Sequence, residues 1–184
     1  MMSENKIQGM YLPEFEHDAC GIGLITNVKR NRSHGLVDDA ILMLENMEHR
    51  GGCGAEPETG DGAGILVELP HDLFANEFNS VGKKLPNRGE YGVAMMFLPK
   101  PFWEDCVEEF NTLATEMGFT ILHERDVPVD NRHTGPTARE NEPKIIQTFL
   151  SQGKLKGKEL ERKLYVLKKY ASKVLKARFD FYVA

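Results

Sequence analysis

Residues 16–25 read EHDACGIGLI and place a cysteine, Cys20, directly before a short apolar segment. The thiolate is the reactive form of cysteine, and an ordinary thiol with a pKa near ~8.5 is mostly protonated at neutral pH, so a nucleophilic cysteine needs a base close by. If Cys20 were the first residue of a processed chain, its own α-amino group, with a pKa of roughly 7.7 to 8.0, would supply that base. The stretch therefore predicts an amino-terminal nucleophile preceded by a removable leader, residues 1–19.

Two glycine-rich motifs follow. Residues 49–54 read HRGGCG, and residues 59–66 read TGDGAGIL. Each motif alone would be weak evidence of function, because glycine-rich turns occur in many folds. The three motifs in this order and at this spacing are much more specific than any one of them.

At these residues the chain resembles the glutaminase domain at the start of the glutamate synthase large subunit, a class II glutamine amidotransferase domain. The resemblance implies that the thiol of Cys20 attacks the side-chain amide carbon of glutamine, forms a thioester and releases ammonia, after which water frees glutamate. It also implies that Arg50, with Gly51, helps to form the glutamine pocket beside the nucleophile. Without the resemblance, Arg50 would be a cation near a helix carboxyl end, where it interacts with the helix dipole.

The local pattern and the resemblance predict different folds. Apolar strands are expected over residues 21–28, 62–69, 91–98, 120–127 and 144–151, and helices over residues 33–51, 71–78, 102–117 and 160–174. Alternating strands and helices favour a parallel α/β sheet. The resemblance implies instead an α+β, four-layer αββα fold of the amino-terminal-nucleophile hydrolase type, with largely antiparallel sheets, and we follow it because periodicity does not fix strand direction.

Residues 20–184 are therefore expected to form the amino-terminal part of an amidotransferase domain, truncated within a last strand over residues 179–184. In the family, an Asn-Gly pair forms the oxyanion hole, and no Asn-Gly pair occurs in this sequence. Loss of an oxyanion donor costs roughly a hundred- to a thousandfold in rate. The chain alone is thus expected to be inactive. Two alternatives remain open: a class II amidotransferase domain serving another acceptor, and a non-catalytic scaffold.

The resemblance also implies partners and cofactors. The ammonia would pass to a synthase domain of the same parent chain that makes glutamate from 2-oxoglutarate. FMN and an iron–sulfur cluster are expected in that parent and not in this segment, and an NAD(P)H-dependent small subunit is a further possible partner.

Composition bounds the class of protein. No apolar run of 18 or more residues exists, and the first residues lack the apolar core of a signal peptide, so a cytoplasmic protein with no membrane partner is expected. The three cysteines, Cys20, Cys53 and Cys106, are widely spaced, which argues against a disulfide framework. Residues 154–178 hold ten Lys or Arg and two Glu, whereas the whole chain has a net charge of −5. A solvated helix face is favoured there over the binding of nucleic acid or of an acidic partner surface.

Residues of these motifs are also compatible with two other kinds of site, a zinc site and a dinucleotide-binding loop. His17, Cys20, His49 and Cys53 have spacings that a structural zinc site uses. That interpretation is disfavoured, because Cys20 would enter a strand directly and ligation would consume the nucleophile; no metal is expected. The glycines of residues 60–64 look like a dinucleotide loop, but such a loop follows a strand and opens a helix, whereas these glycines precede an apolar segment.

Overall fold

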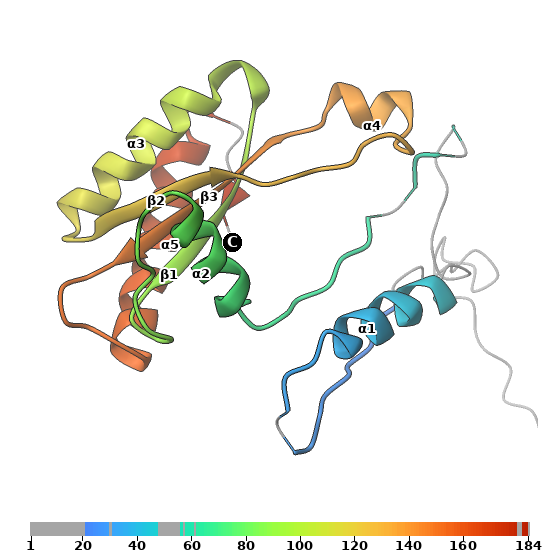
Figure 1. The fold of residues 1–184 in the computed structure, drawn as a ribbon. Helices are drawn as coiled ribbons and strands as arrows, with labels where there is room; N and C mark the ends of the chain where they lie inside the picture. Colours follow the sequence, from blue (N-terminus) through green and yellow to red (C-terminus); the bar gives the residue numbers. More distant parts are fainter. Residues whose placement is uncertain are drawn as a thin grey trace, which may run out of the picture. The chain divides into compact units, whose positions relative to one another are not determined.

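The computed structural model describes residues 21–29, 31–47, 56, 58–60, 62–179 and 182–183. The chain divides into two compact units, Met1–Glu68 and Leu69–Ala184. The elements, in chain order and as labelled in Figure 1, are α1 (Gly35–Asn46), α2 (His71–Ser80), β1 (Gly92–Leu98), the 3-10 turn η3 (Lys100–Phe102), α3 (Trp103–Glu116), β2 (Thr120–Asp126), α4 (Pro136–Glu140), β3 (Lys144–Ser151), α5 (Lys158–Lys176) and β4 (Tyr182–Val183).

Helix α1 is the regular element of the described part of the first unit. Ser33 accepts a hydrogen bond from the backbone N–H of Gly35 at 3.1 Å, but the N-cap residue is His34, whose side chain does not cap the helix. One stripe of α1 is shielded, with Ala40 buried and Met43 and Met47 half-buried. The predicted end of this helix near Gly51 lies outside the described residues.

The prediction of strands over residues 21–28 and 62–69 is wrong for this structure. Both segments lack regular secondary structure, and their large aliphatic side chains are exposed. A strand exists only through its ladder of inter-strand hydrogen bonds. An apolar composition indicates that a segment would be stable when buried in a sheet, but it does not identify a partner strand. Among the described residues, neither segment has a partner strand.

The second unit contains a four-stranded sheet in the order β2-β3-β1-β4. Every pair is antiparallel, which confirms the antiparallel arrangement and excludes the parallel one that the local pattern favoured. The central pair runs in register from Gly92 opposite Leu150 to Leu98 opposite Lys144. A bulge lies in β2 between Ile121 and His123.

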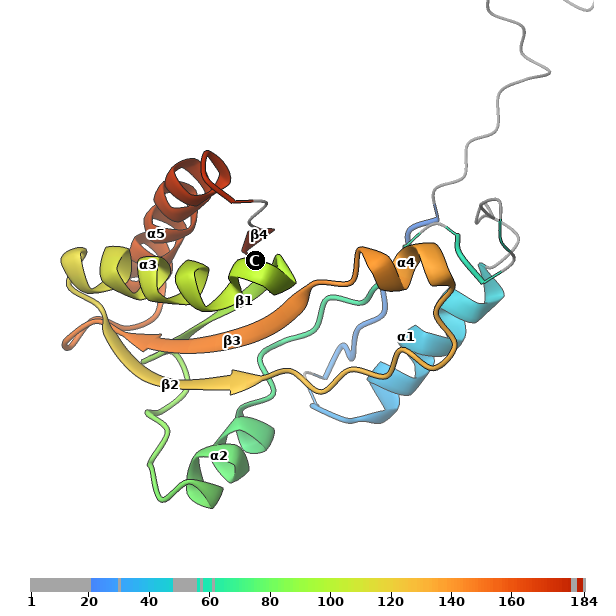
Figure 2. The same cartoon turned by 90° about the horizontal axis from the view of Figure 1, so that it is seen from above.

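Helices cover both faces of this sheet, α3 and α5 one face and α2 the other, as Figure 2 shows. Under α3 and α5 lies the main core, to which β1 contributes the alternate residues Ala94, Met96 and Leu98. Beneath α2, Phe149 packs with Phe74 and Phe78 at ring-centre distances of 4.9 and 5.0 Å, both edge to face. Such aromatic pairs add about 0.5–1.5 kcal/mol each beyond the area they bury.

The predicted boundaries of α3 and α5 are close to the observed ones. Gly118 ends α3 as expected, with a φ of 82° and a bond from its N–H to the carbonyl of Thr115 at 2.9 Å. Helix α5 packs close to β1 because position 92 is glycine: an added Cβ there would lie 2.7 Å from Cδ2 of Leu164. The last predicted strand is confirmed only at Tyr182–Val183, which pairs with β1.

The connection between β2 and β3, predicted as a loop over residues 131–143, contains the short helix α4. Its return to β3 is fixed by Glu142, which accepts hydrogen bonds from Lys100 at 2.7 Å and from Asn131 at 3.2 Å. These charge-assisted bonds hold the pKa of Glu142 below its usual value.

None of the helices in the described parts of the chain is long and apolar enough to span a bilayer.

Candidate active site

The predicted site residues Cys20, Arg50 and Gly51 lie outside the described residues, as does Cys53. Described residues lie close to Cys20 and Arg50 in the sequence. Gly21 is bonded to Cys20, and Met47 precedes Arg50 by three residues. The geometry of these neighbours is what the structure contributes to the site.

The segment after Cys20 runs beside α1 and touches two methionines of that helix (Figure 1). A Cβ added at Gly21 would lie 2.9 Å from Sδ of Met47. A Cβ added at Gly23 would overlap Sδ of Met43 and lie 2.6 Å from its Cε. A Cβ at either position would displace the flexible end of a methionine side chain, so the two glycines let these methionines lie directly against the backbone.

The spacing of these contacts follows from the two backbone geometries. Two residues of extended chain span roughly 6.6 Å, and one face carries every second residue. Four residues of α-helix span about 6 Å along the axis, and residues four apart share a face. Gly21 and Gly23 therefore match Met47 and Met43, and the segment runs antiparallel to α1, with its Cys20 end at the carboxyl end of the helix.

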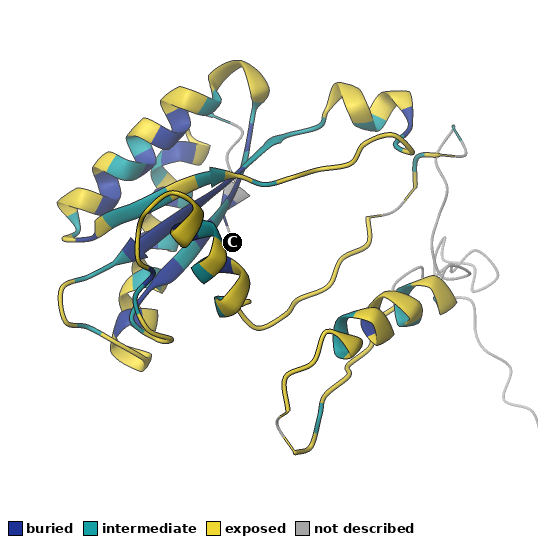
Figure 3. Ribbon diagram, in the orientation of Figure 1, coloured by how far each residue is buried: buried dark blue, intermediate teal, exposed yellow. Residues whose placement is uncertain are grey.

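The other side of the segment is open. The residues that alternate with the glycines, Ile22 and Leu24, are 95% and 89% exposed, and Val28 is 93% exposed. Figure 3 shows the same predominance of exposed residues along this stretch. Fully exposed aliphatic side chains at alternate positions indicate a face that a further layer of protein would cover.

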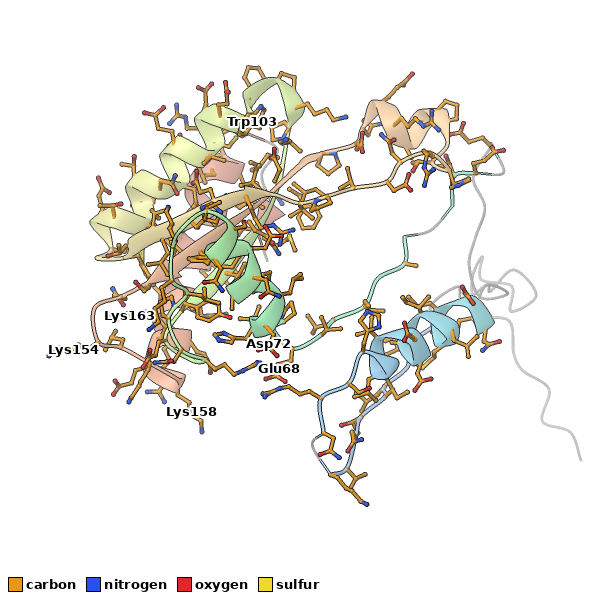
Figure 4. All side chains as sticks on the ribbon, in the orientation of Figure 1. Glu68, Asp72, Trp103, Lys154, Lys158 and Lys163 are labelled. Carbon is orange, nitrogen blue, oxygen red and sulfur yellow. The ribbon has the colours of Figure 1, made fainter. Side chains whose placement is uncertain are left out.

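The second glycine-rich motif is described in part. Thr59 forms a turn, because its N–H bonds the carbonyl of Glu56 at 3.1 Å and its hydroxyl bonds the Glu56 carboxylate at 2.6 Å. A Cβ added at Gly62 or Gly64 would meet nothing within 4 Å. Downstream, Glu68 accepts hydrogen bonds from the guanidinium of Arg32, and these bonds join the end of this motif to the turn before α1. Glu68 is labelled in Figure 4.

The described residues bear on the two alternative chemistries to different extents. The four residues of the zinc interpretation lie outside them, and within them no three His, Cys, Asp or Glu side chains come together as a metal site. No helix begins at the glycines of residues 60–64, since residues 62–70 have no regular structure before α2 begins at His71. A dinucleotide loop would open a helix at once, so this observation also disfavours it.

Cys106 is a structural cysteine. It is fully buried on α3, in the core between that helix and the sheet. Burial first, and then the nearby carboxylates of Asp105 and Glu109, raise the pKa of its thiol to about 11. A thiol that stays protonated and shielded is inert, which agrees with the choice of Cys20 over Cys106 as nucleophile.

The contact of Gly21 and Gly23 with α1 was not predicted from the sequence. The signal was present: two glycines two apart, and two methionines four apart on a predicted helix. Methionine is flexible and suits irregular contacts with backbone. The Arg32–Glu68 ion pair had no signal, because a charged pair 36 residues apart has no periodic pattern.

A family model of the glutamine amidotransferases class-II matches residues 20–184 of this chain. The chain belongs to the class II glutamine amidotransferases. The match begins at Cys20 and includes the first motif from its cysteine onward and the other two motifs in full. The resemblance on which the sequence interpretation rested is thus confirmed, and the non-amidotransferase readings of these motifs lose their support.

Relatives of this amidotransferase chain are glutamate synthases. It is 40% identical to the large chain of the NADPH glutamate synthase of Bacillus subtilis, over 97% of this chain and 12% of that protein. It is 37% identical to the NADH glutamate synthase of Schizosaccharomyces pombe, over 97% of this chain and 9% of that protein. It is 37% identical to ferredoxin-dependent glutamate synthase 2 of Synechocystis, over 91% of this chain and 11% of that protein. The chain therefore spans about a tenth of the length of these relatives.

Proposed function

We propose that this chain supplies glutaminase residues of a glutamate synthase, with Cys20 as the nucleophile. The thiol attacks the side-chain amide carbon of glutamine, ammonia leaves, and the resulting thioester is hydrolysed by water to glutamate and free thiol. The ammonia would then be used to make glutamate from 2-oxoglutarate elsewhere in the parent protein. The observation that carries the proposal is the order of the three motifs in a chain that matches the class II glutamine amidotransferases and is 37–40% identical to glutamate synthases.

Removal of residues 1–19 would make Cys20 the first residue, so that its own amine accepts the thiol proton and returns it to the leaving ammonia. The start of the family match at residue 20 supports this boundary. Arg50 and Gly51 would shape the glutamine pocket. The contact of Gly21 with Met47 supports their role, because Cys20 and Arg50 are one and three residues from the two members of that contact.

The domain would have the four-layer αββα architecture, with the antiparallel sheet of the second unit as one of its two sheets. The large aliphatic side chains that residues 21–28 and 62–69 expose, among them Leu66 at 101%, support a further layer of protein over these segments, since they would then be buried.

FMN and an iron–sulfur cluster would belong to the remaining length of such a parent. A cluster needs several thiolates, and the one cysteine among the described residues, Cys106, is buried in a core. A cytoplasmic location, and a reductase subunit using NAD(P)H in place of ferredoxin, remain part of the proposal. The names of the relatives include both kinds of electron donor.

The test is covalent labelling of a full-length protein that carries this sequence, with a diazoketone analogue of glutamine. The thiolate displaces dinitrogen from the probe and forms a stable thioether. Peptide mass mapping is expected to find the adduct on Cys20, with Cys20 as the amino-terminal residue. Glutamine is expected to protect Cys20 from labelling. Cys20→Ser is expected to abolish both labelling and glutamine hydrolysis, while ammonia-dependent glutamate synthesis persists.

Two matched variants complete the design. Cys106→Ser leaves labelling at Cys20 unchanged, because that thiol is buried in the core beneath α3 and α5 and is shielded from the probe. Arg50→Ala is expected to weaken glutamine hydrolysis by an amount equivalent to more than ~1 kcal/mol. That loss is larger than the ordinary contribution of a cation that interacts with a helix dipole. Labelling that falls first on Cys53, or active enzyme that still carries residues 1–19, contradicts the proposal.

A further inference from the structure

The outer surface of α5 combines charge with exposed aromatic and aliphatic side chains. The side opposite the core carries Lys158, Arg162, Tyr165, Val166, Lys169 and Lys173, which we call the α5 basic face. Tyr165 and Val166 are 61% and 52% exposed, and Lys169 lies over the Tyr165 ring at 5.6 Å. Figure 4 labels Lys158 at the amino-terminal end of this face. A solvated helix face needs the cations but does not need an exposed tyrosine and valine among them.

The neighbouring helix α3 presents the opposite charge. A shallow groove of about 670 Å³ runs along its outer side, past Glu104, Glu108, Asn111, Thr112, Thr115 and Glu116, which we call the α3 acidic groove. Trp103 and Val107 give it an apolar wall. Lys144 lies over the Trp103 ring and is already paired with Asp126 at 2.8 Å.

The two surfaces match in length and in pattern. The acidic groove has charged residues at Glu104 and Glu108 and a neutral threonine one turn further, at position 112. The basic face has charged residues at Lys173 and Lys169 and an aromatic residue one turn before them, at position 165. With the helices antiparallel, Glu104 faces Lys173, Glu108 faces Lys169, and Tyr165 meets the threonines. In this antiparallel arrangement the dipoles of the two helices point in opposite directions, which is electrostatically favourable.

One copy of the chain cannot make this contact with itself. Helices α3 and α5 lie side by side on the same face of one sheet (Figure 2), and the acidic groove and the basic face consist mainly of exposed residues. We propose that the α5 basic face docks into the α3 acidic groove of a second copy of this chain. The contact is head-to-tail: each copy offers one surface of each kind, so association continues beyond the dimer.

The charge of the chain makes the second copy a fitting occupant. Residues 154–178 carry +8, and the rest of the chain carries −13 of the total of −5. Complementary surfaces of this kind steer association and lose attraction as salt screens them. A single helix-on-helix contact is small, so the association is weak and concentration-dependent.

The test is sedimentation velocity of the 184-residue chain over a wide concentration range, at about 50 mM and about 500 mM NaCl, which bracket strong and weak screening. The weight-average mass is expected to rise with concentration at low salt and to return to that of the monomer at high salt. Tyr165→Ser/Lys169→Ser removes the basic face, and Glu104→Gln/Glu108→Gln removes the acidic groove. Each double variant alone stays monomeric.

An equimolar mixture of the two double variants is the decisive sample. One variant keeps an intact groove and the other an intact basic face, so the mixture forms a 1:1 dimer that does not grow further. Val81→Ser/Lys84→Ser, which removes an exposed valine and a lysine near the end of α2, associates like the unmodified chain. Circular dichroism verifies that all variants keep their helix content.

A wild-type chain that stays monomeric at every concentration overturns the proposal. So does association that survives in either double variant, because the contact then uses other surfaces, such as the edge strands. A mixture that contains no 1:1 dimer overturns the pairing of the two faces. These readouts do not depend on glutamine hydrolysis, so they stand apart from the proposed function.

Discussion

Gly23 lies against the thioether of Met43, so closely that a side chain at position 23 would occupy the place of the sulfur. This contact fixes the segment after Cys20 to α1, the helix that leads to the HRGGCG motif. Two sequence motifs 29 residues apart in the chain, counted from Cys20 to His49, are therefore linked through a methionine stripe. The described residues contribute to the site through the packing of a glycine against a helix. They contribute no direct bond between functional groups.

Gly23→Ala is expected to displace Met43 and to destabilise the first unit. Overpacking of this kind typically costs about 1–3 kcal/mol. The measurement is hydrogen exchange of the α1 amides, which should become faster. Gly64→Ala is the matched control, because a Cβ there meets nothing within 4 Å. The double variant Gly23→Ala/Met43→Ala should recover part of the lost protection; no recovery would mean that Met43 is not the obstacle.

Cys106 is expected to resist alkylation in the folded protein. With a pKa of about 11, less than about one thiol in a hundred is ionised at pH 8, and the side chain is fully buried. Iodoacetamide at pH 8, followed by peptide mass mapping, should leave Cys106 unmodified until urea unfolds the chain. Modification in native buffer at the rate of a free cysteine would show that α3 opens readily.

Much of the second unit was predictable because its patterns are local. The apolar run of residues 91–98 and the three-and-four spacing along 160–174 predict β1 and α5 close to their observed bounds. The direction of the strands was not local information, and the family resemblance corrected it. The strand predictions at 21–28 and 62–69 failed because pairing depends on a partner that composition does not name. Cys20, Arg50 and Gly51 remain predictions, carried by the motifs and the family.

His123 is expected to make stability depend on pH. Its ring packs against Phe78 and Phe149, at ring-centre distances of 5.3 and 6.3 Å. Burial first, and then the nearby Lys83, lower the pKa of this histidine below its ordinary value of 6.5. The folded state therefore binds this proton more weakly than the unfolded state. The stability that the neutral ring contributes is complete above pH 6.5 and is lost as the pH falls through that value toward the folded pKa.

Urea unfolding at pH 7.5 and 5.5 measures the effect. Wild type should lose more stability on acidification than His123→Gln, which has no proton to take up there. His133→Gln, at an exposed position between β2 and β3, is the control and should behave as wild type. Equal losses for wild type and His123→Gln would show that the ring is protonated without cost in the fold.

Thr148→Val is expected to stabilise the second unit. Thr148 is fully buried in β3, on the face toward α3 and α5, and its hydroxyl has no hydrogen-bond partner among the described residues. A buried hydroxyl without a partner costs about 1–3 kcal/mol, and valine has nearly the same shape without that group. The urea midpoint should rise by an amount equivalent to about 1 kcal/mol with an unchanged slope. Thr120→Val, at an exposed position of β2, should stay within about 0.5 kcal/mol of wild type. A lower midpoint for Thr148→Val would mean that the hydroxyl is bonded in solution and that the core of this sheet needs it.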